Sequence, residues 1–190
     1  MKEIKTQLNY LADHELEVGI LDSAGKFIMM IAQVNEYGTT IRPHKQWLTI
    51  PLNDEAAGHR AGEFKGLFKP KGKKILALPQ SDGSIKPMFA LTKQVVIPQR
   101  SFIRSTYDEH HGQWFELIEK EIENIFWGRQ SGRGLFILLG ETIQKSIQTK
   151  ITKMTKPRNA PLTEHLKGKN DPLVDTGKLR ASVSYRIVRK

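Results

Sequence analysis

Cysteine is absent from the 190-residue chain, which excludes disulfide bonds and thiolate metal sites. This absence is typical of proteins that fold in a reducing compartment. Long apolar runs are also absent. No stretch approaches the roughly 18 consecutive apolar residues of a membrane span, and the amino-terminal segment has no run of signal-peptide length. The sequence therefore predicts a soluble protein made in the cytoplasm, with no membrane partner.

The sequence also lacks the residue patterns of common catalytic sites. No pair of histidines has the spacing of a helical zinc site, and the adjacent His110 and His111 would point to different faces of a helix. The glycine- and lysine-rich segment 66–74 has five residues between its glycines and lacks the Ser or Thr of a phosphate loop. A single Asp-Thr-Gly triplet at 175–177 cannot supply the two carboxylates of an aspartic protease. We therefore expect no enzyme activity, no cofactor and no metal.

The charge of the chain, +10 in total, alternates in sign along the sequence. Residues 1–40 and 105–131 are acidic overall, whereas residues 41–104 and 132–190 are basic. A nucleic-acid-binding protein more often concentrates one sign of charge. Alternating blocks suit a subunit that meets its own copies through complementary patches, although they are equally compatible with solvated faces.

The first half of the chain predicts mainly short strands. Residues 16–21 have the composition of a strand, and 24–38 have a helical stripe that ends at a glycine. Residues 47–52 indicate another strand, broken by Pro51, and the glycine-rich 53–73 indicate irregular chain.

A hairpin is predicted in the next segment. Two β-rich runs, 74–79 and 85–98, flank an Asp-Gly turn. Pro87 indicates that the second strand lies at a sheet edge or begins after this residue. We interpret residues 44–97 as an inserted β-hairpin subdomain or arm.

The second half predicts two long helices, near 107–127 and 134–153, from apolar residues repeated at helical spacing. Residues 155–172 read as an exposed loop, and 183–188 alternate as a strand. We expect the first and last strands to pair. The fold class is then α+β, a single domain over 1–190 with a small antiparallel sheet packed against two to three helices.

A run of lysines lies within the basic second block, interleaved with Phe64 and Phe68. Such a run could contact DNA phosphates and bases. In the alternative interpretation it is a solubilising loop whose phenylalanines anchor it to its own core. The candidate residues near DNA phosphates are Lys65, Lys69, Lys71, Lys73 and Lys74.

Three phrases, in order, resemble a known family. They are VGIL…IAQVNEYGTT over 18–40, VVIPQRSFIRST over 95–106 and PLVDTGKLRASVSYRI over 172–187. Together they resemble the tail-completion proteins of tailed bacteriophages, which are also described as minor tail, virion morphogenesis or head–tail joining proteins. The segment 44–97 departs from shorter members of that family.

The resemblance implies a structural virion protein, made in the host cytoplasm and located in the neck or tail of the particle. It implies a homo-oligomeric ring, expected to be a hexamer, at the head–tail interface or the top of the tail tube. The implied partners are tail tube, terminator, connector or stopper proteins, with genomic DNA in the lumen. A nucleic-acid-binding module of a mobile element is the alternative.

The phrases also provide candidate structural or interface residues. We expect the residues 35–38 of the first phrase to end a helix, with Glu36 able to pair across a subunit boundary. Pro98 and Arg100 would fix the chain before the next helix, and Asp175 or Thr176 would cap a short helical turn. Fold maintenance is favoured over direct partner contact for all of them. The complete set is Asn35, Glu36, Tyr37, Gly38, Pro98, Arg100, Phe102, Asp175, Thr176, Gly177, Leu179 and Arg180.

Overall fold

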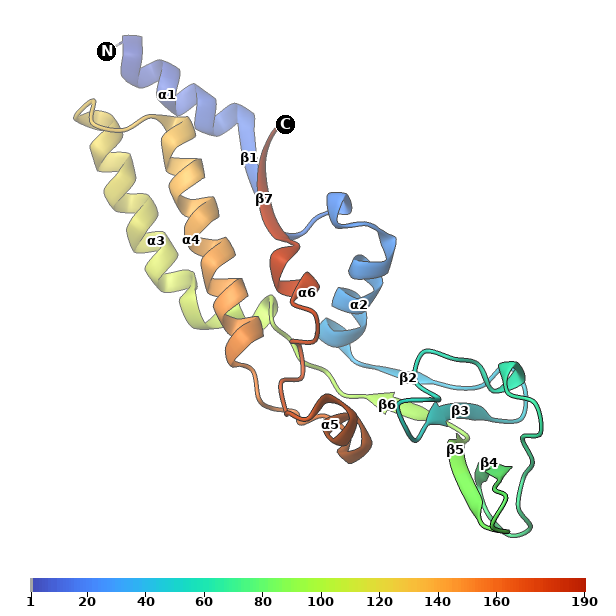
Figure 1. Ribbon diagram of the computed structural model, residues 1–190. Helices are drawn as coiled ribbons and strands as arrows, with labels where there is room; N and C mark the ends of the chain where they lie inside the picture. The colour runs from blue at the N-terminus through green and yellow to red at the C-terminus, as the bar shows by residue number, and fades with distance from the viewer. Residues whose placement is uncertain (1) are drawn as a thin grey trace. The chain divides into compact units, whose positions relative to one another are not determined.

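The computed structural model describes residues 2–190 and has an α+β fold (Figure 1). The chain divides into two compact units. Among the described residues, unit 1 contains 2–37, 99–158 and 171–190, and unit 2 contains 38–98 and 159–170. The predicted insertion, 44–97, falls wholly within unit 2, which also takes in a later segment of the chain.

Unit 1 is built on a two-stranded antiparallel sheet that joins the two ends of the sequence. Strand β1 pairs with β7 along its full length, with His14 opposite Arg189 and Ile20 opposite Val183. This confirms the predicted pairing of the first and last strands. The elements of unit 1 are α1 (Lys2–Asp13), β1 (His14–Ile20), the short 3₁₀ helix η1 (Asp22–Ala24), α2 (Lys26–Tyr37), α3 (Arg104–Phe126), α4 (Gly132–Lys153), α6 (Lys178–Ala181) and β7 (Val183–Arg189).

Helix α4 supplies most of the packing in this unit. Its apolar residues recur every four positions, and the first of them, Leu135 and Leu139, pack with Trp114 and Ile125 of α3. Helix α4 also contacts β1 and β7 (Figure 1). Its close fit to the sheet depends on Gly140, since a Cβ there would lie 2.5 Å from the ring of Tyr185. Ser131 begins the helix by accepting a hydrogen bond from the Gly134 backbone N–H at 2.9 Å.

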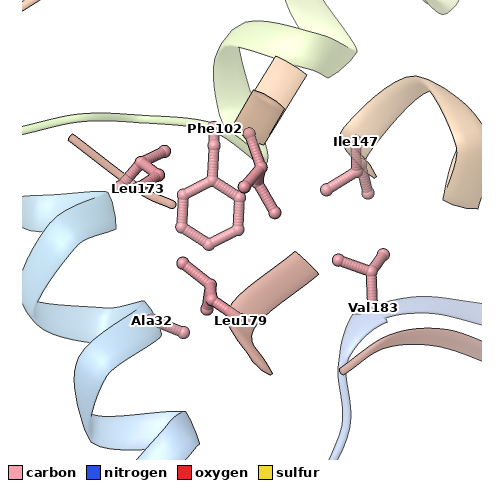
Figure 2. Close-up of a cluster of buried hydrophobic side chains, with 7 residues drawn as sticks. Ala32, Phe102, Ile147, Leu173, Leu179 and Val183 are labelled. Atoms are coloured by element: carbon pink, nitrogen blue, oxygen red, sulfur yellow. The ribbon is translucent and has the colours of Figure 1, made fainter. Parts of the chain in front are cut away.

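The principal core of unit 1 gathers residues from segments far apart in the sequence (Figure 2). Phe102, from the segment before α3, is fully buried at its centre. Around it lie buried side chains from α2, α4, α6 and β7 and from the segment before α6. These are Ala32, Ile147, Ile151, Leu173, Leu179 and Val183.

Unit 2 carries two small antiparallel sheets. Strands β2 and β6 form one, and β3, β5 and β4 form the other in that order, with β5 in the centre. A separate core of Ala56, Met88 and Phe89 supports the second sheet. The elements are β2 (Thr39–Ile41), β3 (Leu48–Pro51), η2 (Ala61–Glu63), β4 (Ile75–Pro79), β5 (Ile85–Thr92), β6 (Val95–Ile97) and α5 (Pro161–Lys167).

The predicted β4–β5 hairpin is confirmed, but the edge position inferred from Pro87 is wrong. Pro87 lies inside β5, the central strand. The strand tolerates it because the register with β4 shifts at this point, where Leu76 faces Phe89 but Ala77 faces Pro87. Pairing with β3 already ends at Phe89. The N–H that Pro87 lacks is therefore not needed for a regular hydrogen bond between β5 and its neighbouring strands.

Two helices differ from the sequence-based expectations. Helix α1 was not predicted. The loop expected over 155–172 contains α5, which begins at Pro161 and ends at Gly168 in the left-handed conformation. Proline in the first turn and glycine after the last turn are both ordinary helix-end residues. Within residues 2–190 we find no helix with the length and apolar content needed to cross a bilayer.

Candidate functional site

The carboxylate of Glu36, at the end of α2, lies against the first turn of α3. It accepts hydrogen bonds from the backbone N–H groups of Phe102 at 2.8 Å, Ile103 at 2.9 Å and Arg104 at 3.0 Å. The Ser101 hydroxyl donates to it at 2.6 Å, and the Arg104 guanidinium donates at 3.1 Å. Glu36 is only 4% exposed. One buried carboxylate therefore satisfies the free N–H groups at the start of a helix more than 60 residues away in sequence.

This geometry also fixes the charge of Glu36. Burial acts to raise the pKa of the carboxyl group, but the hydrogen bonds from Ile103, Ser101 and Arg104 together outweigh it and hold the pKa below its ordinary value. A negative charge at a helix amino terminus is further favoured by the helix dipole. No side chain caps α3 at its own N-cap residue, Ile103. Glu36 supplies that cap from another part of the chain.

These contacts favour fold maintenance for Glu36 over pairing across a subunit boundary. Its oxygens are occupied within its own chain. The favoured alternative, fold maintenance, describes its contacts: it ties the first family-like phrase to the second. Sequence alone shows that both segments flank helix ends, but it does not show that they meet.

Arg100 forms a second buried link in the same region. Its backbone N–H donates to the Asn35 carbonyl at 2.6 Å, and its guanidinium donates to the carbonyl oxygens of Pro157 and Arg158, both at 3.0 Å. A longer contact, 3.3 Å, reaches the Asn35 side chain. Burial lowers the pKa of the Arg100 guanidinium, but arginine stays charged in proteins. Arg100 therefore holds the chain after α4 beside the end of α2.

The other residues of the first two phrases have simpler roles. Tyr37 is exposed, and the Arg104 guanidinium stacks on its ring with 4.6 Å to the centroid. Gly38 follows α2 with a φ of +70°, a conformation that favours glycine, which confirms the predicted helix stop. Pro98 is half-buried before the segment that Glu36 binds.

The third phrase packs into the core through three buried residues, Leu173, Leu179 and Val183. Leu179 of α6 is buried against Phe102, whereas Asp175, Thr176 and Arg180 are exposed. The predicted capping of α6 by Asp175 or Thr176 is wrong. Gly177, with a φ of +77°, is the N-cap, and no side chain bonds to it. The glycine conformation turns the chain so sharply that neither preceding side chain holds the cap position.

The first and third phrases also border one groove of about 290 Å³. Its walls are α2 on one side and residues 172–179 on the other, and we call it the α2/α6 groove. The lining residues are Phe27, Ile28, Ile31, Asn35, Pro172, Leu173, Asp175, Thr176, Gly177, Lys178 and Leu179.

The five lysines between 65 and 74 are all exposed in unit 2. Phe64 packs edge-on against Phe89 with 5.7 Å between ring centroids, so it anchors this segment to the unit 2 core. Phe68 is 39% exposed, and its backbone pairs with Ala77. Lys69 lies over the ring of Trp47 at 5.4 Å. These contacts favour the anchored-loop interpretation for Phe64 and leave the lysine charges available to solvent.

A second basic surface was not identified from the sequence. A groove of about 860 Å³ between the start of α3 and the end of α4 is lined by four lysines, several hydroxyls and one ion pair, Glu109 with Lys150. The spacing of lysines on α4 could have revealed it, since residues three and four apart share a helix face. The lysines are Lys145, Lys150, Lys153 and Lys156.

The histidines at the start of α3 lie among aromatic and basic neighbours. His110 borders the basic groove, and His111 stacks on Tyr107 with 5.2 Å between ring centroids. Within residues 2–190, no group of three or more His, Asp or Glu side chains is arranged to hold a metal ion.

Comparison of the chain with protein-family models, with curated proteins and with solved structures finds no match. The resemblance to tail-completion proteins therefore rests on the three sequence phrases alone.

Proposed function

We propose that this protein is a structural subunit of a tailed-bacteriophage virion that acts in tail completion and head–tail joining. It would form part of a ring at the head–tail interface or at the top of the tail tube. One observation carries the proposal. The three family-like phrases, far apart in the sequence, meet in one buried centre, where Glu36 binds 102–104 and Leu179 packs on Phe102. A resemblance confined to unrelated loops would have no such common centre.

The surface of unit 1 supports an assembling subunit. Aromatic residues and methionine are enriched in protein interfaces, and clustered apolar side chains on a surface often mark such sites. In unit 1 the exposed aromatic residues and methionines lie mainly on α2 and α3. These two helices flank α4 and the β1–β7 sheet from different sides (Figure 1). The exposed residues are Phe27, Met29, Met30, Tyr37, Tyr107, Phe115, Phe126 and Trp127.

The direct test is to purify the phage particles whose genome encodes this chain and to image their necks by cryo-electron microscopy. We expect a ring of density that fits unit 1 between portal and tail tube. Deleting the gene should leave filled heads and separate tails. Normal particles from the deletion strain, with no trace of the chain in wild-type particles by mass spectrometry, would refute the proposal.

The second candidate is a nucleic-acid-binding module of a mobile element. The exposed lysines of 65–74 and the four lysines of the basic groove favour it. It requires that the isolated chain bind DNA with an affinity that falls steeply with salt. Absence from particles together with such binding would replace the first proposal with this one.

A further inference from the structure

Trp127 is the most exposed of the large apolar side chains described, at 74%. It follows the last residue of α3, and its neighbour Phe126 is 54% exposed. Tryptophan is the residue type that most often anchors a protein interface, usually by filling a pocket on the partner. An indole this exposed is costly for an isolated chain, because its apolar surface remains in water.

The α2/α6 groove has the properties of a receiving pocket. Its apolar walls come from Phe27, Ile28, Ile31, Leu173 and Leu179. A volume of about 290 Å³ is at the lower end for small-molecule sites and fits a single anchoring side chain. Asp175 also lines the groove and offers a carboxylate to an indole N–H.

Trp127 cannot reach the groove of its own chain. Helix α3 contains 23 residues, so it spans roughly 35 Å at about 1.5 Å per residue. Glu36 binds the residues at the start of α3 and holds that end beside α2. Trp127 lies at the opposite end (Figure 1). Any indole in the groove must therefore come from another chain.

The charges around the two surfaces are complementary. Glu116, Glu119 and Glu123 are exposed on α3 and form no ion pair among the described residues. Lys178 lines the α2/α6 groove, and Lys26 is exposed next to Phe27. The acidic row that leads to Trp127 thus has two basic residues to match it, Lys178 in the groove lining and Lys26 beside Phe27, while Asp175 is available to the indole N–H.

We propose that Trp127 of one copy docks in the α2/α6 groove of the next copy, with the acidic row of α3 facing Lys178 and Lys26. This inference rests on the proposed role as a ring subunit and names the contact between neighbours. Trp127 and the α2/α6 groove belong to different surfaces of unit 1. In a ring, each copy makes this contact with its next neighbour in one direction only, so the contact is heterologous, and repeating it produces a closed ring or a filament.

The natural lack of cysteine permits a direct test by disulfide cross-linking. The double variant Glu123→Cys/Lys178→Cys places one thiol beside Trp127 and the other at the groove rim. On oxidation of the purified, concentrated chain we expect a ladder of dimers, trimers and larger species on non-reducing gels. The matched control, Glu123→Cys/Thr152→Cys, moves the second thiol to an exposed site on α4 and should give no ladder.

Mixing two single variants of different tag length tests the direction of the contact. Glu123→Cys with Lys178→Cys should give mainly mixed dimers. The inference would be overturned if Glu123→Cys gave homodimers in the same yield as the mixed dimers. It would also be overturned if the double variant cross-linked no better than its control.

A side-chain test separates docking from folding. Trp127→Ala added to the double variant should reduce the ladder at least about tenfold, in line with the loss of an interface anchor. Phe115→Ala, which removes an exposed aromatic elsewhere on α3, should not reduce it. Both variants should keep the wild-type far-ultraviolet circular dichroism.

The outcomes for the contact and for the virion role are distinguishable. An unchanged ladder with Trp127→Ala would rule out the anchor. A chain found in the neck without the ladder refutes only this contact, whereas a ladder from a chain absent from particles refutes only the virion role.

Discussion

At the scale of single residues, Glu36 is a buried charged group whose desolvation cost is offset by hydrogen bonds from its immediate neighbours. Its carboxylate faces three backbone N–H groups, a hydroxyl and a guanidinium. An amide in its place would present its own N–H groups to these donors. Although glutamine has nearly the same shape as glutamate, replacing Glu36 with it should therefore lower the stability of the fold substantially.

We predict that Glu36→Gln lowers the free energy of unfolding by about 2–4 kcal/mol at neutral pH, because buried donors lose their acceptor. Urea denaturation followed by circular dichroism measures this loss. Glu116→Gln, at an exposed site on α3, is the matched control and should change stability by less than about 0.5 kcal/mol. Equal effects of the two substitutions would contradict the buried-cap interpretation.

The same residue predicts a pH dependence. The pKa of Glu36 is lowered in the folded chain from an ordinary value of 4.5. Its stabilising contribution is therefore complete above about 4.5 and is lost as pH falls through the lower, folded pKa. The stability difference between wild type and Glu36→Gln should be constant from about pH 8 to 6 and shrink below about pH 4.5. A difference that persists unchanged at about pH 3 would show that ionisation of Glu36 is not involved.

At the scale of elements, helix packing makes a prediction about two glycines. A Cβ at Gly140 of α4 would lie 2.5 Å from the ring of Tyr185, whereas a Cβ at Gly112 of α3 would meet nothing within 4 Å. Gly140→Ala should destabilise by about 1–3 kcal/mol through overpacking. Gly112→Ala should stabilise by up to about 1 kcal/mol through helix propensity. Thermal melts measure the stability change of each variant. A change in melting temperature of the same sign for both would contradict the close packing of α4 on β7.

The elements that sequence reasoning identified are those with strong periodicity. Helices α3 and α4 and the strands of the β4–β5 hairpin were predicted from apolar spacing and an Asp-Gly turn, which depend on local physics. Helix α1 was not predicted, although Ile4, Leu8 and Leu11 have helical spacing. Helix α5 was missed although Pro161 and Gly168 mark its ends.

The candidate site was less predictable than the elements, for a physical reason. The links between Glu36 and the start of α3, and between Arg100 and the chain after α4, join segments 57–68 residues apart. Local patterns carry no information on which helix ends meet. The α2/α6 groove likewise exists only once Leu179 has packed on Phe102.

At the scale of the whole molecule, the division into two units predicts that unit 1 is an independent folding body. Its two cores contain only unit 1 residues, and the unit 2 core contains only unit 2 residues. Strands β2 and β6 pair close to where the chain leaves and re-enters unit 1, with Ile41 opposite Val95. Replacing 42–94 by Asn-Gly would convert this pair into a two-residue hairpin.

We predict that this shortened chain keeps the helical circular dichroism of unit 1 and unfolds in one cooperative transition. A matched control replaces 42–94 by a long Gly-Ser linker, which preserves the connection without the hairpin and should be somewhat less stable. Loss of the helical signal in both variants would refute the independence of unit 1.

The pairing of β1 with β7 has a consequence for synthesis of the chain. His14 finds its partner only when Arg189 has been made. At about 5–20 residues per second, β1 waits roughly 10–35 s on the ribosome with its edge unpaired. During that interval its backbone is open to other nascent chains. Synthesis of β7 therefore decides when this edge of β1 is covered by its native partner.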